Sequence, residues 1–84
     1  MSFDAALVRE QGVSFAVVVV KGHVVNSDSS RREAISSFAG HFPGVPIVLM
    51  AQDGRGTPTF WGRPDIVRFL ARVPVSSLPW RRFS

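Results

Sequence analysis

The 84-residue sequence has no cysteine, and this absence excludes several kinds of chemistry at once. Without thiols the chain has no disulfide, no zinc-cysteine site, no thiol nucleophile and no dithiol redox couple. Disulfides and structural metals are common ways for a small domain to gain stability beyond its own core. We therefore expect self-association to supply the missing burial.

Long hydrophobic segments and a basic leader are also missing. The longest apolar run covers residues 15–20 and ends at Lys21, far short of the roughly 20 residues that a membrane helix needs. The N-terminal residues carry Asp4 and Glu10 instead of a basic start followed by an apolar stretch, so they do not indicate a secretory signal. These features predict a cytoplasmic protein without a membrane-spanning segment.

Positive charge comes almost entirely from arginine, with nine arginines against one lysine and a formal net charge of +4. Such a balance favours anionic partners such as nucleic acid or phosphate-bearing ligands. An arginine excess also arises in GC-rich genomes, and a small positive charge serves solubility. Charge alone leaves both interpretations open.

The length indicates a single domain, which we place at residues 1–74, followed by a C-terminal tail, residues 75–84, that packs back on the domain or is partly mobile. A chain of this size buries only about 60 to 65% of the surface that its unfolded form exposes. The hydrophobic fraction of 45% and the charged fraction of 19% are typical of a globular protein. We expect marginal stability unless another molecule covers apolar surface.

The apolar pattern predicts a small α/β domain. Residues 13–20 and 45–51 are almost continuously apolar, which is typical of strands covered on both faces. Between them, Ser30 and Glu33 have the spacing of a helix capping box, and Pro43 ends the helix. Strand, helix and strand form a crossover, so the two strands should be parallel.

Three more elements complete the predicted order helix, strand, helix, strand, strand, helix. Residues 2–11 are predicted as a short helix capped by Ser2. Residues 57–61 return as an antiparallel hairpin strand, at a sheet edge because Pro58 cannot donate to a ladder. A last helix begins at Pro64. The predicted fold class is therefore α/β, with a mixed sheet of about three strands and helices packed on it.

The segment Gly44-Val45-Pro46-Ile47-Val48-Leu49 resembles the part of thioredoxin-like proteins where a cis-proline precedes a buried strand. The similarity continues through Asp53-Gly54 at the hairpin turn and Gly62 before the last helix, and it covers residues 13–73. It implies the C-terminal part of that fold, with Pro46 as the cis-proline and a surface beside it that meets extended peptides. The strand and helix that carry the Cys-x-x-Cys motif have no counterpart here, so the redox function does not transfer.

Candidate binding residues lie at the hairpin tip and along the edge strand, and each has a plain structural alternative. Arg55 lies between two glycines, where backbone amides and a guanidinium can hold an anion, although glycines also serve a turn alone. Trp61 marks a contact surface if it is exposed, because Phe60 and Trp61 point to opposite faces of a strand. The full set of candidates is Pro46, Arg55, Trp61, Arg63, Trp80, Arg81 and Arg82.

The C-terminal cluster Trp80-Arg81-Arg82-Phe83 interleaves aromatic rings with positive charge. This pattern suits base stacking with phosphate contacts, or an arm that docks on a partner. The structural alternative is that Trp80 covers the domain's own apolar surface while the arginines stay solvated.

No pattern indicates catalysis, a metal or a cofactor. His23 and His41 are the only histidines, and neither has a second ligand at a familiar metal spacing. The sequence has no Gly-x-Ser-x-Gly elbow, no phosphate-binding loop and no dinucleotide fingerprint. We predict no catalytic residue, no metal site and no cofactor.

Two long apolar strands need cover on both faces, more than three short helices and three strands are expected to supply. We therefore predict a non-catalytic protein-interaction module, homodimeric or bound to another protein through the sheet edge near Trp61 and the tail. The first alternative is an anion or nucleic-acid binder that uses Arg55, Arg63, Arg81 and Arg82. The second alternative is an enzyme of unrecognised type.

Overall fold

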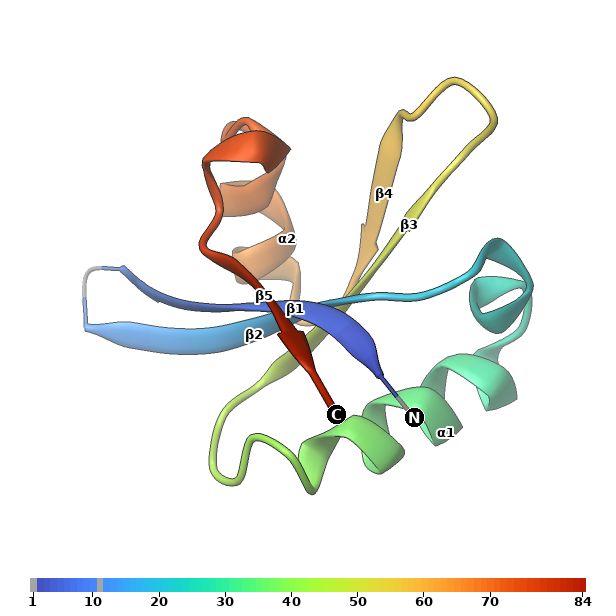
Figure 1. Cartoon of the computed structure of the whole chain (residues 1–84), viewed down its shortest axis with the longest axis horizontal. Helices are drawn as coiled ribbons and strands as arrows, with labels where there is room; N and C mark the ends of the chain where they lie inside the picture. The colour runs from blue at the N-terminus through green and yellow to red at the C-terminus, as the bar shows by residue number, and fades with distance from the viewer. Residues whose placement is uncertain (1, 11) are drawn as a thin grey trace.

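The computed structural model describes residues 2–10 and 12–84, which form a five-stranded mixed sheet between two helices (Figure 1). The strands are β1 (Phe3–Glu10), β2 (Val13–Val19), β3 (Ile47–Gln52), β4 (Pro58–Trp61) and β5 (Trp80–Phe83), in the spatial order β4-β3-β2-β1-β5. Helix α1 (Asp28–Ala39) packs on one face of the sheet and helix α2 (Pro64–Leu70) on the other. Short 3-10 turns, η1 (Gly22–Val25) and η2 (Val75–Ser77), precede α1 and β5.

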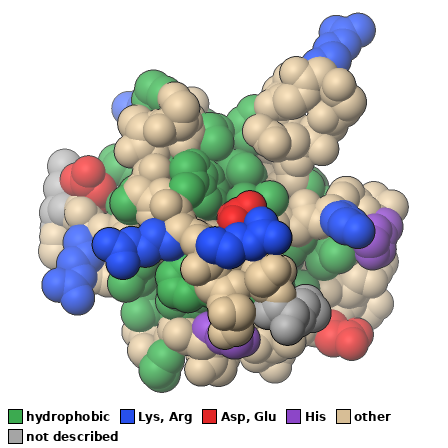
Figure 2. Space-filling model, viewed as in Figure 1, with side chains coloured by type: hydrophobic (Ala, Val, Ile, Leu, Met, Phe, Trp, Pro, Cys, Tyr) green, Lys and Arg blue, Asp and Glu red, His purple; other side chains and the backbone are tan. Residues whose placement is uncertain are grey.

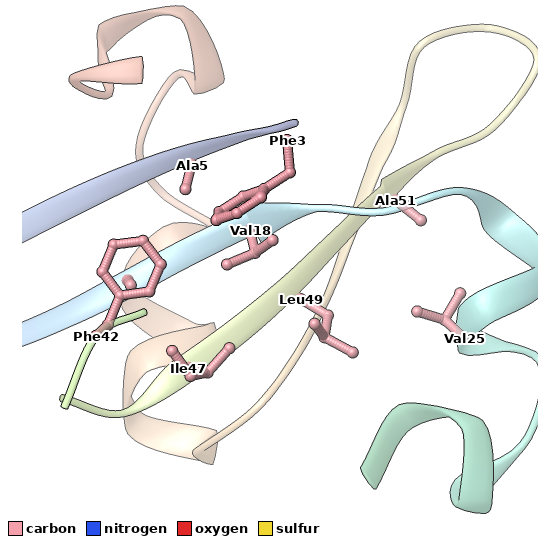
Figure 3. Packing of buried hydrophobic residues seen from close by; sticks show 9 residues of the cluster. Phe3, Ala5, Val18, Val25, Phe42, Ile47, Leu49 and Ala51 are labelled. Carbon is pink, nitrogen blue, oxygen red and sulfur yellow. The ribbon is translucent and has the colours of Figure 1, made fainter. Parts of the chain in front are cut away.

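The parallel pair β2 and β3 forms the centre of the sheet. Val17 lies beside Val48 and Val18 beside Leu49, and all four side chains are fully buried. Because successive strand residues point to opposite faces, each strand feeds two cores. The core on the α1 side contains Val18 and Leu49, and Figure 3 shows them with their neighbours from β1 and η1. The core on the α2 side contains Val17 and Val48.

The prediction of a three-stranded sheet with three helices is wrong, and the first reason is β1. Residues 2–11 were expected as a helix, but Phe3–Glu10 is a strand that pairs antiparallel with β2 on one side and with β5 on the other. Glu10 and Val13 close the hairpin, and Gly12 between them has a φ of +78°, a left-handed value that glycine adopts without steric cost. An isolated helix this short is marginal in water, whereas β2 pairs with Ala5–Glu10 and β5 pairs with Phe3–Ala6, so that neighbouring strands bond much of the β1 backbone.

The second reason is the C-terminal segment. Residues 75–84, expected as a tail, contain η2 and the strand β5, whose Phe83 lies opposite Phe3 and whose Trp80 lies opposite Ala6. The pairing joins the two ends of the chain side by side, as Figure 1 shows. Leu78, just before β5, is buried in the core on the α2 side.

The added strands also cover the middle of the two central strands, more than the sequence led us to expect of a single chain. Residues 15–18 of β2 are at most 2% exposed, and residues 47–51 of β3 are at most 6% exposed. β1 shields one flank of β2, and β4 shields the outer flank of β3. A single molecule therefore buries the middle of both central strands, whereas Val13, at the start of β2, is 38% exposed.

The remaining boundaries differ from the predictions by a few residues. Helix α1 begins three residues earlier than expected, because the hydroxyl of Ser27, not that of Ser30, caps it and accepts a hydrogen bond from the Ser30 amide at 3.2 Å. Pro64 occupies the first turn of α2 and Pro58 begins the edge strand β4, as predicted. In the described part of the chain no helix is long and apolar enough to cross a membrane.

The turn from β4 into α2 depends on Gly62. A Cβ atom at this position would lie 2.9 Å from Cγ2 of Val48 and 3.2 Å from its Cα, closer than real Cβ contacts. The turn passes directly over β3, and only a residue without a side chain fits there.

We expect Gly62→Ala to lower the free energy of unfolding by about 1 to 3 kcal/mol, because the added methyl group overpacks the buried Val48. The control is Gly40→Ala at the end of α1, where the nearest atom to a new Cβ is the Ser37 carbonyl oxygen at 3.8 Å. This control should be neutral or stabilising by less than about 1 kcal/mol. Urea denaturation followed by circular dichroism measures both, and equal midpoints for the two variants would contradict this packing.

Candidate functional site

In the hairpin loop between β3 and β4, the carboxylate of Asp53 accepts hydrogen bonds from backbone amides of the same loop. Oδ1 of Asp53 accepts hydrogen bonds from the amides of Arg55 and Thr57 at 2.8 and 2.9 Å. The amide of Gly56 donates to the Asp53 carbonyl oxygen at 3.0 Å. The amides of Arg55 and Gly56 therefore have partners inside the loop, and the Arg55 side chain is exposed at the tip.

Pro46 and Trp61 both contribute to the structure of the sheet and its core. The Pro46 carbonyl oxygen accepts a hydrogen bond from the Ala16 amide at 2.9 Å and so begins the pairing of β3 with β2. No peptide bond among the described residues is cis, that of Pro46 included. Trp61 is half-buried against the core on the α1 side, and Phe60 is half-buried against the opposite core. Trp61 is thus not the exposed edge aromatic that would mark a contact surface.

Arg63 is held in an ion pair at the start of α2. Its Nη2 lies 2.7 Å from Oδ2 of Asp65, and its Nε lies 3.1 Å from Oδ1, a two-point contact. The hydrogen bond from Arg63 lowers the pKa of Asp65, and the same bond raises the pKa of Arg63. Both groups are exposed, so this pair arranges the surface without contributing much stability.

The strand β5 presents its two arginines to solvent between two anchored aromatic residues. Trp80 donates from Nε1 to the Val75 carbonyl oxygen at 2.8 Å, and the Phe83 ring stacks on Phe3 with centroids 5.5 Å apart. Arg82 contacts the Asp4 carboxylate at 3.2 Å, while Arg81 makes no ion pair within the described residues. Two of the seven predicted residues, Arg81 and Arg82, are therefore exposed at consecutive positions of an edge strand.

The four predicted arginines do not form one site. Arg81 and Arg82 lie on β5 near the C-terminus, whereas the loop that carries Arg55 is at the far end of the β3–β4 hairpin (Figure 1). Figure 2 shows Lys and Arg side chains in a row across the face where β1 and β5 lie nearest the viewer, with acidic groups among them. Within the predicted set, the structure brings together only Trp80, Arg81 and Arg82.

A groove that sequence reasoning missed lies between α1 and the ends of β1 and β2, with a volume of about 680 Å³. Its charged members are Asp4, Lys21, Glu33 and Arg82. Its apolar members are Phe3, Val19, Val20, Val24, Ala34 and Phe38. The signal that could have found it is positional, because ligands in α/β sheets often bind outside the carboxyl end of a parallel strand. The groove adjoins that end of β2.

Titratable groups are all at least partly exposed in the described part of the chain, where no polar or charged residue is buried. No group of three or more His, Asp or Glu side chains among these residues is placed to hold a metal ion.

The Arg63–Asp65 pair gives a titration prediction. Arg63→Gln should raise the pKa of Asp65 toward its ordinary value, as followed by the chemical shift of the Asp65 carboxyl carbon. A lowered folded-state pKa stabilises the fold above the unfolded-state pKa, and this contribution is lost as the pH falls through the folded-state pKa, below about pH 4. Arg72→Gln, which removes an exposed arginine outside the pair, should leave the Asp65 titration in place. An unchanged midpoint in Arg63→Gln would contradict the assigned cause.

No protein-family model, curated protein or solved structure matches this chain.

Proposed function

We propose that this chain is a non-catalytic protein-interaction module that binds an extended, acidic segment of a partner protein along the outer edge of β5. The observation that carries the proposal is the position of β5 at the end of the sheet, with two exposed arginines as its central residues. An edge strand leaves alternate backbone N–H and C=O groups unpaired, and these accept an added strand. The partner's backbone would supply affinity and its acidic side chains specificity.

The register of β5 defines the charge pattern that a partner should carry. Arg81 lies opposite Ala5 and Arg82 opposite Asp4, so the two arginines point to opposite faces of the sheet. A strand added beside β5 has side chains next to both, and opposite charges at such cross-strand positions are favourable. The matching segment has one acidic residue for Arg81, which makes no ion pair within the described residues, and beside it a second one that shares the Arg82 guanidinium with Asp4.

The anchored ends of β5 support this mode of binding. Trp80 is fixed by its bond to Val75, and Phe83 is fixed by rings of Phe3 and of Phe42, the latter at 5.1 Å between centroids. A strand that is already ordered loses little conformational entropy when a peptide pairs with it. The edge of β5 is thus preorganised for binding.

The same arginines disfavour a second copy as the occupant of this edge. Antiparallel pairing of a strand with its own copy about a two-fold axis places one residue directly opposite itself. The two registers of β5 with the longest overlap centre on Arg81 or on Arg82. Like charges directly opposite each other are destabilising, so an acidic partner fits better than a copy of this chain.

The test is a titration of the full-length chain with the peptide Val-Thr-Glu-Glu-Thr-Val, followed by amide chemical shifts. We expect shifts concentrated on β5 and β1, with binding weakened about tenfold by Arg81→Glu, because this change replaces an attraction with a repulsion. The matched control Arg72→Glu changes the net charge equally but lies outside β5. Binding should also weaken as the salt concentration rises.

Two further measurements separate the alternatives. A peptide with Lys-Lys in place of Glu-Glu should not bind, and light scattering at several concentrations should report a monomer. Equal weakening by Arg81→Glu and Arg72→Glu would contradict the assignment to β5. A dimer that the neutral variant Arg81→Gln strengthens would show that a second copy occupies this edge, because the like-charge pair is then removed. Preferential binding of a single-stranded oligonucleotide would support the nucleic-acid alternative.

A further inference from the structure

We propose that the groove between α1 and the ends of β1 and β2 binds a small zwitterion with an apolar body, of the class of free apolar α-amino acids. The groove shares Arg82 with β5, so the two proposals are tested with different probes and with variants at residues that belong to one site only. Its volume of about 680 Å³ lies within the range of roughly 300 to 1,000 Å³ that is usual for small-molecule sites.

The packing of α1 leaves room for an occupant. None of the twelve residues of α1 is buried, although Ala34, Ile35 and Phe38 face the sheet and pack against its core. In α2, by contrast, Ile66 and Leu70 are buried. The apolar face of α1 therefore retains accessible surface, and a ligand in the groove would remove part of it from water.

The floor of the groove suits a flat or branched apolar group. Phe3 and Phe38 both line it, with ring centroids 4.9 Å apart and planes inclined at 60°. Val20 and Val24 add aliphatic surface from the end of β2 and from η1. These side chains offer dispersion contacts and no hydrogen bonds, so the body of the ligand should be apolar.

The charged side chains that line the groove indicate which charged groups the ligand should carry. Asp4 and Arg82 contact each other at 3.2 Å and neutralise each other. Lys21, after β2, and Glu33, on α1, line the same groove but form no ion pair with each other or with any other described residue.

A ligand that carries only a negative charge would meet Glu33, and a ligand that carries only a positive charge would meet Lys21. A ligand with both charges satisfies both side chains, its carboxylate near Lys21 and its ammonium near Glu33. The hydroxyl groups of Ser30 and Ser37, which also line the groove, supply further hydrogen-bonding groups.

The experiment titrates the full-length chain with phenylalanine and records amide chemical shifts. We expect a dissociation constant of about 0.1 to 1 mM, with shifts in the groove, at Phe3, Val20 and Phe38, and not on the β3–β4 loop. Two matched probes each remove one charge: N-acetyl-phenylalanine lacks the ammonium, and 2-phenylethylamine lacks the carboxylate. Both should bind at least about tenfold more weakly than phenylalanine.

Charge-neutral variants identify the partner of each charge. In Glu33→Gln, phenylalanine and N-acetyl-phenylalanine should bind equally weakly, and in Lys21→Gln, phenylalanine and 2-phenylethylamine should do so. Glu10→Gln, which neutralises an exposed glutamate outside the groove, should bind phenylalanine like the parent chain.

The proposal is overturned if none of the three probes shifts the groove residues at 20 mM, or if the single-charge probes bind as well as phenylalanine. Neither result bears on the acidic segment at β5, because Lys21 and Glu33 lie outside that strand. Conversely, failure of the peptide titration leaves the groove measurement intact.

Discussion

The parallel pairing of β2 with β3 is the interaction on which the rest of this structure depends. Val17, Val18, Val48 and Leu49 are all fully buried, and they project in pairs toward both faces of the sheet. A strand pair that is apolar on both faces cannot lie on the surface, so the chain must place cover above and below it. This requirement puts α1 and α2 on opposite sides of the sheet and makes two small cores instead of one.

A chain of this length meets that requirement by using its two ends as strands. β1 covers the flank of β2, and β5 then covers part of β1, so that residues from both termini extend the sheet. The widened sheet ends at β5, so the outer edge of this strand, which contains Arg81 and Arg82, has no neighbouring strand to pair with. Charged residues on an edge strand discourage uncontrolled pairing, and under our proposal the same charges give the edge its selectivity for an acidic partner.

The second consequence of limited length is the unequal packing of the two helices. Helix α2 buries Ile66 and Leu70, whereas α1 has no buried residue and leaves the groove beside it. The loosely covered face contains the charges of Lys21 and Glu33, which find no ion-pair partner in the described chain. The two proposed sites thus lie at the edge of the sheet, where β5 has no further strand beside it, and next to α1, the less deeply packed of the two helices.

The sequence by itself determined the centre of the fold, because unbroken apolar runs such as residues 13–20 and 45–51 are stable only when both faces are shielded from water. It also determined the parallel crossover between them, the hairpin of β3 with β4 and the start of α2 at Pro64, where local turn chemistry is decisive. Of the candidate arginines, Arg81 and Arg82 lie on the edge strand β5 and Arg63 pairs with Asp65, whereas Arg55 bonds Asp53 through its backbone amide alone. The sequence did not distinguish these situations.

Only the tertiary structure decided that residues 3–10 are a strand and that residues 80–83 are another. Phe3, Ala6 and Leu7 fit a helical face as well as a strand, and the choice depends on partners up to eighty positions away, such as Phe83 opposite Phe3. The groove was equally out of reach, since it exists only when Phe3, Lys21 and Glu33 come together from separate elements. The local sequence pattern shows which side chains of a segment must be buried. The free energy of pairing with distant strands decides which other segment of the chain covers them.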